Sequence, residues 1–234
     1  MGLVRMGAPN NLIEKLAASF KISNFVETGT YHGGTAIWAA NFFKNVLTIE
    51  YSKELYEQAI AKFDISNIEF IFGDSRTELS KLIERLDSSS LFWLDAHWSG
   101  GLTYGDTDQC PLIEEINIIN SSNFDNFILI DDARLFTSPP QPPHKIEQWP
   151  DIASVIQALK SKQSDKYIVI IEDVIIAVPS FAKPVVSEYC QNVNAKAWED
   201  YGKQLKASNF DKALQLIYQG IKGKLGSIKM SASP

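Results

Sequence analysis

The chain has 234 residues, a length that suits one large domain with an appendage better than two full domains. Hydrophobic residues make up 45% and charged residues 21%, which is typical of a globular protein and excludes a disordered chain. The formal net charge of -6 argues against a general nucleic-acid binder, because such a protein carries a basic face.

The first two-thirds of the chain alternates short apolar runs, which predict strands, with amphipathic runs, which predict helices. Because the predicted strands are continuously apolar and alternate with helices, they indicate a doubly wound, mostly parallel sheet covered on both faces. In chain order the pattern predicts a helix at 11–21, a strand at 24–28, a helix at 34–44, a strand at 46–50, a helix at 53–63, a strand at 68–72, a helix at 76–86, a strand at 90–95, a helix from Pro111 to about Asn120, a strand at 126–131 and a helix at 151–162.

The pattern changes after the fifth predicted strand. Residues 167–171 and 174–178 are strongly apolar and are separated only by Glu172 and Asp173. So short a connection permits an antiparallel hairpin but no helical crossover. The predicted fold class is therefore α/β, with a doubly wound, Rossmann-like sheet that ends in an antiparallel hairpin.

The C-terminal part predicts helices only. Residues 195–223 suggest two helices joined near Ser208–Asn209, and Leu214, Ile217, Tyr218 and Ile221 form an apolar stripe on the second. One helical pair cannot bury its own apolar face, so we expect it to pack on the main domain or to serve a dimer interface. The predicted division is an α/β domain at 1–180 and a C-terminal helical appendage at 181–234.

Two connections stand out by composition. Residues 133–150 contain five prolines and no clear periodicity, and a connection of this length is often a functional lid. Residues 97–110 combine glycines with Trp98 and Tyr104. Together the two segments are candidates for a lid that closes over a cleft, with a surface loop as the simpler alternative.

A glycine-containing turn follows the first predicted strand. Glu27 ends the strand, and Gly29 and Gly33 come two and six positions later. Glycine tolerates a positive φ and lets a ligand approach the backbone, at the place where doubly wound folds bind nucleotides. The spacing is not the G-x-G-x-x-G dinucleotide fingerprint, and a turn needed only for packing stays an alternative.

Acidic residues also end the second and third predicted strands. Glu50 lies 23 residues after Glu27, where a carboxylate can accept both hydroxyls of a ribose or cap the helix that begins after Ser52. Asp74 follows the third strand and can accept a hydrogen bond from an adenine amino group, or cap the helix that begins near Arg76.

This combination of acidic strand ends and a glycine turn resembles the class I S-adenosylmethionine-dependent methyltransferases. Their pattern is E/D-x-G-x-x-x-G after the first strand and an acid after each of the next two, and a terminal antiparallel hairpin also fits that family. The resemblance covers about residues 22–180 and implies S-adenosylmethionine as cofactor, with Glu50 at its ribose and Asp74 at its adenine. The implied cofactor-binding residues are Glu27, Thr28, Gly29, Thr30, Gly33, Glu50, Asp74, Ser75 and Asp95, of which Glu27, Gly29 and Gly33 would line its methionine part.

Aspartates end the fourth and fifth predicted strands, at Asp95 and at Asp131-Asp132. Neighbouring parallel strands lie about 4.8 Å apart, so the three carboxylates should converge. Like charges repel unless a cation neutralises them, and hard oxygen ligands suit Mg²⁺, Ca²⁺ or Mn²⁺ better than Zn²⁺. The alternative is that these aspartates cap the helices that follow.

This second constellation resembles the metal-dependent O-methyltransferases of the catechol type and the antibiotic-sugar type. In those families an Asp after the fourth strand and an Asp-Asp or Asp-Asn pair after the fifth hold a divalent cation, which matches Asp95, Asp131 and Asp132. The sugar-modifying relatives carry an acidic base two residues after the first metal aspartate, and this chain departs from them with His97. The resemblance implies a divalent cation, with Mg²⁺ the first choice.

A methyl acceptor hydroxyl must be nearly deprotonated and aimed at the methyl carbon. A cation can bind vicinal hydroxyls and lower the pKa of one, and His97 beside Asp95 is the predicted catalytic base. A metal ligand or a structural loop histidine are the alternatives for His97. Arg134 directly follows the aspartate pair and either binds an anionic substrate group or pairs with a neighbouring carboxylate.

The predicted function is O-methyl transfer from S-adenosylmethionine, assisted by a divalent metal, to a hydroxyl of a sugar, a nucleotide-linked sugar or another small polyhydroxy substrate. The alternatives are a non-catalytic cofactor-binding protein that docks a partner, and a hydrolase whose metal is held by Asp95, His97, Asp131 and Asp132. A homo-oligomer is possible through the C-terminal stripe. The chain lacks the G-x-G-x-x-G fingerprint that an NAD-dependent oxidoreductase needs, which argues against that class of enzyme.

Several simple features bear on location. No apolar run approaches the roughly 20 residues of a membrane-spanning helix. The first ten residues, MGLVRMGAPN, lack the apolar core of a signal peptide. Cys110 and Cys190 are too few for a disulfide framework, so we predict a reduced, cytoplasmic protein without nucleic-acid partners.

Overall fold

A computed structural model describes residues 7–98, 100, 105, 108–161 and 165–230, and of residues 207–209 and 211–230 it describes the backbone alone. Contacts divide the chain into two compact units between Ser187 and Glu188. In the described part of the chain no helix has the length and apolarity of a membrane span. Both cysteines are free thiols.

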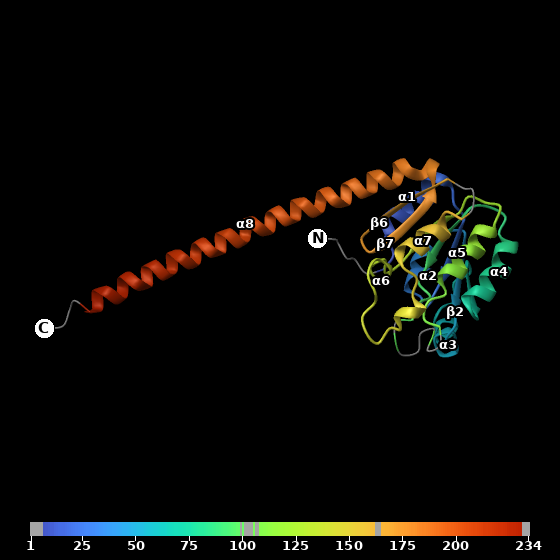
Figure 1. Ribbon diagram of the computed structural model, residues 1–234, viewed down its shortest axis with the longest axis horizontal. Helices are drawn as coiled ribbons and strands as arrows, with labels where there is room; N and C mark the ends of the chain where they lie inside the picture. Colours follow the sequence, from blue (N-terminus) through green and yellow to red (C-terminus); the bar gives the residue numbers. More distant parts are fainter. Residues whose placement is uncertain (1–6, 99, 101–104, 106–107, 162–164, 231–234) are drawn as a thin grey trace. The chain divides into compact units, whose positions relative to one another are not determined.

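Seven strands form one sheet in the order β3-β2-β1-β4-β5-β7-β6 (Figure 1). The first five strands are parallel to one another, and β7 runs antiparallel to both β5 and β6. The predicted doubly wound sheet and its terminal hairpin are thus confirmed. The strands are β1 (Asn24–Thr28), β2 (Asn45–Glu50), β3 (Ile68–Phe72), β4 (Ser90–Leu94), β5 (Phe127–Ile130), β6 (Lys166–Ile171) and β7 (Val174–Pro179).

The hairpin turn explains the antiparallel end of the sheet. Ile171 pairs with Val174, so Glu172 and Asp173 form a two-residue loop. Both loop residues have positive φ, 51° and 67°, as in the type I′ turns that match the twist of a hairpin.

Three helices of the first unit begin at a side-chain cap. Ser52, Asp74 and Asp151 each accept a hydrogen bond from a backbone amide in the first turn of α3, α4 or α7. The helices are α1 (Asn10–Phe20), α2 (Gly34–Ala39), α3 (Lys53–Lys62), α4 (Ser75–Arg85), α5 (Leu112–Ser121), α6 (Arg134–Thr137) and α7 (Ile152–Leu159), with 3₁₀ turns η1 (Ile146–Gln148) and η2 (Ser180–Ala182).

Helix α2 is shorter than the predicted 34–44. The side-chain amide of Asn41 donates to the carbonyls of Ile37 and Trp38, at 3.2 and 3.0 Å. The side chain competes for these carbonyls, and the backbone amides of Asn41 and Phe42 donate to carbonyls only three residues back, so the last turn tightens and the helix ends.

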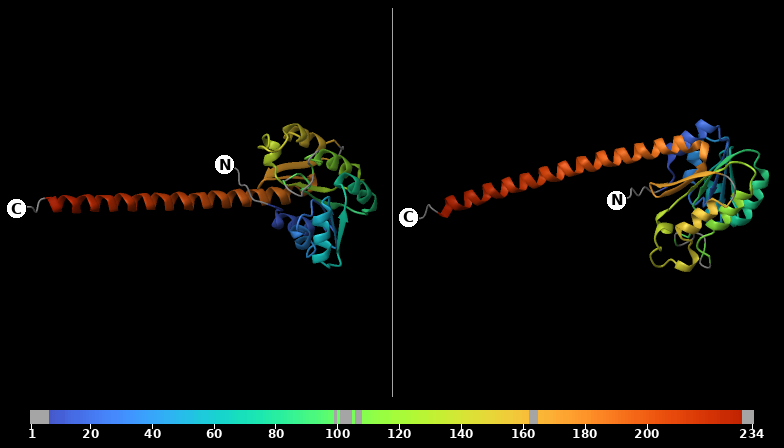
Figure 2. Two further views of the ribbon diagram at one scale, coloured as in Figure 1. Left: turned by 90° about the horizontal axis from the view of Figure 1, so that it is seen from below. Right: turned by 45° about the horizontal axis from the view of Figure 1, so that its top comes forward.

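The strand order places helices on both faces of the sheet. The chain moves outward from β1 to β2 and β3, then returns to β4 and β5 on the other side of β1. Right-handed crossovers therefore put α2 and α3 on one face and α4 and α5 on the opposite face. Contacts extend the second layer to α7, which packs on α5 (Figures 1 and 2).

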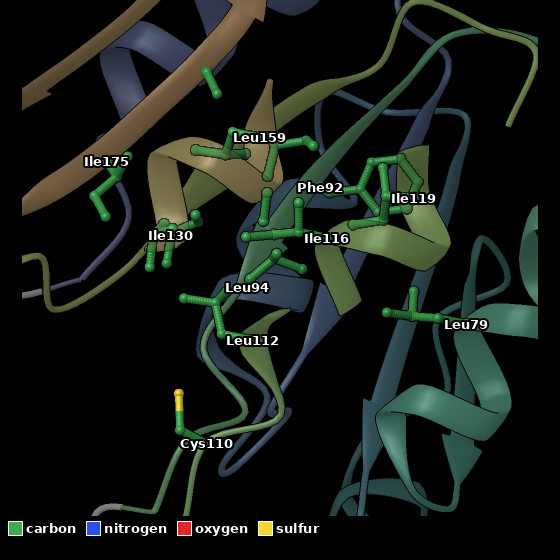
Figure 3. Packing of buried hydrophobic residues seen from close by; sticks show 14 of the residues in the cluster. Leu79, Phe92, Leu94, Cys110, Leu112, Ile116, Ile119, Ile130, Leu159 and Ile175 are labelled. Atoms are coloured by element: carbon green, nitrogen blue, oxygen red, sulfur yellow. The ribbon is translucent and has the colours of Figure 1, made fainter. Parts of the chain in front are cut away.

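Side chains of β4 alternate between these two layers. Phe92 and Leu94 point into a buried cluster with Ile116 and Ile119 of α5 and Leu159 of α7 (Figure 3). The intervening Leu91 and Trp93 are equally buried but lie outside that cluster. Burial on both faces explains the continuous apolar runs in the sequence.

The second unit lies on α8 (Lys183–Met230), one uninterrupted helix of 48 residues. The predicted break at Ser208–Asn209 is wrong. Both residues are weak helix formers, but neither removes a backbone donor as proline does, and the cost of each is only a few tenths of a kcal/mol. Pairs such as Lys203–Glu199, at 2.7 Å, support the described part of the helix. The predicted apolar stripe at 214–221 lies where the structure describes the backbone alone, so its role stays a prediction.

Candidate functional site

Three predicted site segments meet at the carboxyl edge of the sheet. The chain changes direction between β1 and β4, which is where open α/β sheets bind ligands. The strand pairing continues past the strands, since the amide of Asp95 donates to the carbonyl of Thr28 at 3.0 Å and that of Asp131 to Leu94 at 3.1 Å. These bonds bring Asp95 beside the glycine turn and Asp131 beside Asp95.

A cavity of about 260 Å³ opens at this edge. Five residues predicted from the sequence line it: Gly29, Glu50, Ser75, Asp95 and His97. Sequence reasoning missed other lining residues, among them Tyr31, Tyr51, Leu55, Gly73 and Ala96. Of the remaining predicted residues, Glu27, Thr28, Thr30, Gly33 and Asp74 lie around the cavity's strand ends without lining it, as do Asp131 and Asp132.

Gly29 permits the closest backbone approach in the site. Its φ is +88°, and a Cβ there would lie 2.4 Å from the carbonyl oxygen of Asp95. Gly33 begins α2 with φ +75°, and a Cβ there would lie 3.3 Å from the ring of Phe63. Packing therefore requires glycine at position 29 whatever the cavity binds.

Glu27 is a buried acid beneath the cavity. Its Oε2 accepts a 2.6 Å hydrogen bond from the hydroxyl of Thr48, which also shares a 2.6 Å bond with Thr30. Burial raises the pKa of Glu27 from its ordinary 4.5 to about 8, and the hydroxyls of Thr48 and Thr35 oppose that rise. The group is therefore mostly protonated at neutral pH, and a nearby cation would favour loss of the proton.

Glu50 accepts hydrogen bonds from backbone amides and also lines the cavity. Its Oε2 accepts from the amide of Tyr31 and its Oε1 from the amide of Ser52, both at 2.8 Å. Burial raises the pKa of Glu50, and the bond from Ser52 is the largest opposing influence. The backbone amides of Tyr51 and Thr30 also oppose this rise by hydrogen bonding to the carboxylate. The predicted link to the start of α3 is present, and the carboxylate still lines the cavity.

Asp74 takes the capping role that the sequence offered as one of two alternatives. Its Oδ1 accepts from the amide of Arg76 at 2.9 Å, and its Oδ2 from the guanidinium of Arg76 at 2.7 Å. The same guanidinium donates to Asp108 at 2.6 Å. Arg76 thus ties the start of α4 to the described end of the 97–110 segment.

Glu115 is an acid that the sequence analysis overlooked. It is 1% exposed and lies on the inner face of α5. Burial raises the pKa of Glu115 to about 7, and the hydroxyls of Ser75 and Thr28 oppose this rise. The sequence does hold a signal for this burial. Glu115 comes three residues after the buried Leu112 and directly before the buried Ile116, a spacing that puts it on the apolar face of the helix.

His97 lies between two carboxylates. Its Nε2 is 3.4 Å from Oδ1 of Asp95 and 3.4 Å from Oδ2 of Asp132. Asp132 has a left-handed backbone, with φ +55°, and its amide donates to Oδ1 of Asp131 at 2.8 Å. The predicted convergence of the strand-end aspartates is therefore present, with an imidazole at its centre.

Burial sets the protonation of this cluster. It raises the pKa of Asp95 well above its usual value, and Asp131 and then Asp132 raise it further. The pKa of Asp131 rises to about 7, first through burial and then through Asp132. Burial lowers the pKa of His97 although Asp132 opposes it, so a neutral imidazole is favoured.

Arg134 supplies positive charge to the cluster. Its Nη1 donates to Oδ1 of Asp132 at 2.6 Å and to Oδ2 of Asp173. Its backbone amide donates to Oδ1 of Asp173 at 2.8 Å. Of the two roles predicted for Arg134, the structure has the pairing with carboxylates. Asp173, from the hairpin turn, was not anticipated as part of the site.

The predicted metal ligands do not fit a cation as they lie. In the described ranges no group of three or more His, Cys, Asp or Glu side chains is arranged to hold a metal ion. Arg134 occupies Oδ1 of Asp132, and Oδ2 of that residue faces His97. Oδ1 of Asp131 accepts from the backbone. A divalent cation on Asp132 would therefore lie against the positive charge of Arg134.

The two predicted lid segments are joined where they are described. The side-chain carbonyl of Gln109 accepts from the indole of Trp149 at 2.9 Å and from the amide of Lys145 at 2.8 Å. The ring of His144 lies 5.2 Å from Trp98 and 5.0 Å from Trp149. Most of 99–107, including Tyr104, lies outside the described residues, so lid closure stays a prediction.

No protein-family model and no curated protein matches the chain. Several solved structures do. The O-methyltransferase TomG of Streptomyces achromogenes, involved in tomaymycin synthesis and in complex with S-adenosylmethionine, is 16% identical over 75% of this chain and 82% of its own, with a TM-score of 0.52.

An O-methyltransferase from Bacillus cereus in complex with S-adenosylhomocysteine is 15% identical over 75% of this chain and 83% of its own, with a TM-score of 0.54. The S-adenosylhomocysteine-bound methyltransferase PaMTH1 of Podospora anserina is 16% identical over 75% and 80%, with a TM-score of 0.51. At such low identity these likenesses establish architecture alone. The chain has the fold of these methyltransferases, the class I fold expected from its sequence.

Proposed function

We propose that the chain is an S-adenosylmethionine-dependent O-methyltransferase whose cofactor lies in the cavity at the carboxyl edge of the sheet. The observation that carries the proposal is that one cavity brings together Gly29, Glu50, Ser75 and Asp95, which lie at or just after the ends of four different strands. Support also comes from similar solved structures that hold S-adenosylmethionine or its demethylated product.

The lining residues suit the three parts of the cofactor. The ribose hydroxyls would donate to the carboxylate of Glu50, which lines the cavity and is held in place by backbone amides such as those of Tyr31 and Ser52. The half-exposed ring of Tyr51 at the rim offers an aromatic face to the adenine, near Ser75 and Asp74. The sulfonium end would lie by Gly29, above Glu27, whose ionisation it would favour.

The proposed reaction is an in-line displacement. The acceptor oxygen forms a bond to the methyl carbon, the carbon–sulfur bond breaks, and its electron pair returns to sulfur as the thioether. The proton of the acceptor hydroxyl passes to Nε2 of His97, which is neutral by burial and lines the cavity. Asp95 and Asp132, both 3.4 Å from that nitrogen, would stabilise the imidazolium.

For the acceptor we propose a hydroxyl of a sugar, a nucleotide-linked sugar or another small polyhydroxy compound. Support comes from acidic side chains that can accept hydroxyl hydrogen bonds beside His97, and from the indole of Trp98, which follows His97 directly in the chain. We also propose that residues 1–180 are the catalytic domain, that 181–234 form an appendage suited to self-association, and that the protein acts in the cytoplasm.

The divalent cation stays a prediction from the sequence. Bound by Asp95, Asp131 and Asp132, it would act as a Lewis acid on the acceptor hydroxyl, but Arg134 would first have to leave Asp132. Methyl transfer measured in excess EDTA decides the point, because an enzyme that needs the cation loses its activity there.

The experiment that tests the proposed function is transfer of labelled methyl groups from S-adenosylmethionine to a panel of free and nucleotide-linked sugars. We expect label in at least one acceptor and S-adenosylhomocysteine as the second product. Binding of NAD with no response to S-adenosylmethionine would refute the proposal. A matched control is His32→Gln, because His32 is exposed and lies outside the cavity lining.

A further inference from the structure

We infer that the guanidinium of Arg134, held by Asp173, takes the position beside Asp132 that a divalent cation would occupy, so that the acidic cluster carries its own positive charge. The inference deepens the proposed function, since it concerns the charge beside the reacting hydroxyl, and it rests on that function only for its catalytic meaning. The four contacts that carry it join α6, the end of β5 and the β6–β7 turn.

Asp173 clamps Arg134 from two sides. Its Oδ1 accepts from the backbone amide of Arg134 at 2.8 Å, and its Oδ2 accepts from the guanidinium. Its backbone carbonyl accepts from the amide of Ala133 at 2.7 Å. The Asp173 side chain is only 4% exposed, and these bonds hold the start of α6 against the hairpin turn. A side chain anchored at both ends loses little entropy when it binds a further carboxylate.

The guanidinium then faces the cluster. It donates to Oδ1 of Asp132 at 2.6 Å, and Oδ2 of the same carboxylate faces His97, which in turn faces Asp95. The resulting chain runs from Asp173 through Arg134, Asp132 and His97 to Asp95. Arg134 and His97 separate the three carboxylates along this chain, so no two of them follow each other directly.

Arginine is chemically suited to this role. A guanidinium keeps its charge at any physiological pH and forms charge-assisted hydrogen bonds with fixed geometry. A cation bound to the oxygen that accepts this bond would lie beside the guanidinium, and the two positive charges would repel each other. Without Arg134, four carboxylates would lie near one another with no described cationic side chain bonded to Asp132, and a divalent cation would be their best remaining partner.

The test is Mn²⁺ binding, followed by the loss of the free Mn²⁺ signal in electron paramagnetic resonance, and it needs no methyl acceptor. The full chain is compared with Arg134→Met, which keeps the length of the side chain, and with Arg134→Ala and Arg134→Lys. Arg85→Ala is the matched control, because Arg85 pairs with Glu69 on the surface. Binding of S-adenosylhomocysteine, measured by calorimetry, checks that each variant retains its cavity.

We expect the unaltered protein, Arg134→Lys and Arg85→Ala to bind Mn²⁺ weakly. Arg134→Met or Arg134→Ala should bind one Mn²⁺ roughly ten- to a hundredfold more tightly, the range seen when groups around a metal ligand are changed. Stoichiometric Mn²⁺ binding by the unaltered protein would overturn the inference. Equal, weak binding by all variants that still bind S-adenosylhomocysteine would overturn it too. If the unaltered protein does not bind S-adenosylhomocysteine, the proposed function is refuted instead. The comparison of Mn²⁺ binding between the variants does not depend on that result.

Discussion

Asp173 and Arg134 are joined by two hydrogen bonds that connect a hairpin turn to the start of a four-residue helix. The two residues lie 39 positions apart in the chain. Neither belongs to the acidic strand ends, yet their contact positions the guanidinium that bonds to Asp132. A structural role and a site role therefore meet in one contact, and they can be separated by experiment.

Replacement of Asp173 by asparagine should destabilise the fold. The variant removes the charge of one of the two carboxylates that bond to the guanidinium of Arg134 and leaves Asp132 in place, which costs about 1–3 kcal/mol once the partial exposure of Arg134 is considered. The free energy of unfolding in urea measures this. The control Glu57→Gln removes an exposed carboxylate 3.7 Å from Lys53 and should change stability by less than about 0.5 kcal/mol. Equal stabilities of the two variants would contradict the anchoring role.

The variant Gly29→Ala tests the turn after β1. Its Cβ would lie 2.4 Å from the carbonyl oxygen of Asp95, in a backbone conformation with φ +88°. We expect a loss of roughly 2–4 kcal/mol in stability together with loss of S-adenosylmethionine binding. Gly34→Ala is a close control, because nothing lies within 4 Å of its Cβ and it sits in helix α2. If both variants unfold at the same urea concentration, the close approach does not matter.

A cofactor contact is tested by Glu50→Gln. Glutamine keeps an oxygen for one backbone amide but lacks the charge and the second acceptor, so we expect S-adenosylhomocysteine to bind about tenfold more weakly. Calorimetry gives the affinity directly. Glu69→Gln, on the exposed side of β3, should bind as the unaltered protein does. An unchanged affinity in Glu50→Gln would remove Glu50 from the cofactor site.

Glu27 should make stability depend on pH. Its pKa is about 8 in the folded protein and near 4.5 when unfolded, so its contribution is fully present below pH 4.5. As pH rises from 4.5 to 8 that contribution is lost, by at most about 1.4 kcal/mol per pH unit. Urea unfolding across this range should therefore show a steeper decline in the unaltered protein than in Glu27→Gln. Parallel pH profiles of the two proteins would show that Glu27 does not titrate as its burial requires.

The base is tested by His97→Gln. We expect methyl transfer to fall by about 10²–10⁴, the usual contribution of a general base, while S-adenosylhomocysteine affinity stays within a few-fold. The control His32→Gln removes an exposed imidazole and should keep its rate. Transfer by His97→Gln at the rate of the unaltered protein would assign the proton to another group.

Much of the fold follows from simple patterns. Every strand lies within one residue of its predicted bounds, because burial on both faces demands continuous apolar runs that glycine and acidic residues interrupt. The exceptions depend on local bonds and on the absence of a breaker. Asn41 ends α2 through its own side chain, and α8 continues through Ser208–Asn209.

The site was predictable where strands determine it and not where loops do. Parallel pairing alone brings Asp95 beside Gly29 and Asp131. The partners of Arg134 depend on where the β6–β7 turn lands, and no spacing along the chain encodes that contact. Glu115 was hidden for a different reason, since an acid on the apolar face of a helix reads as an exception until its surroundings are known.

The most direct test of the central claim is calorimetric titration of the unaltered protein with S-adenosylmethionine, S-adenosylhomocysteine and NAD. The account predicts one S-adenosylmethionine and one S-adenosylhomocysteine site per chain, both weakened about tenfold in Glu50→Gln, with no binding of NAD. Binding of NAD alone, or of none of the three ligands, would contradict it.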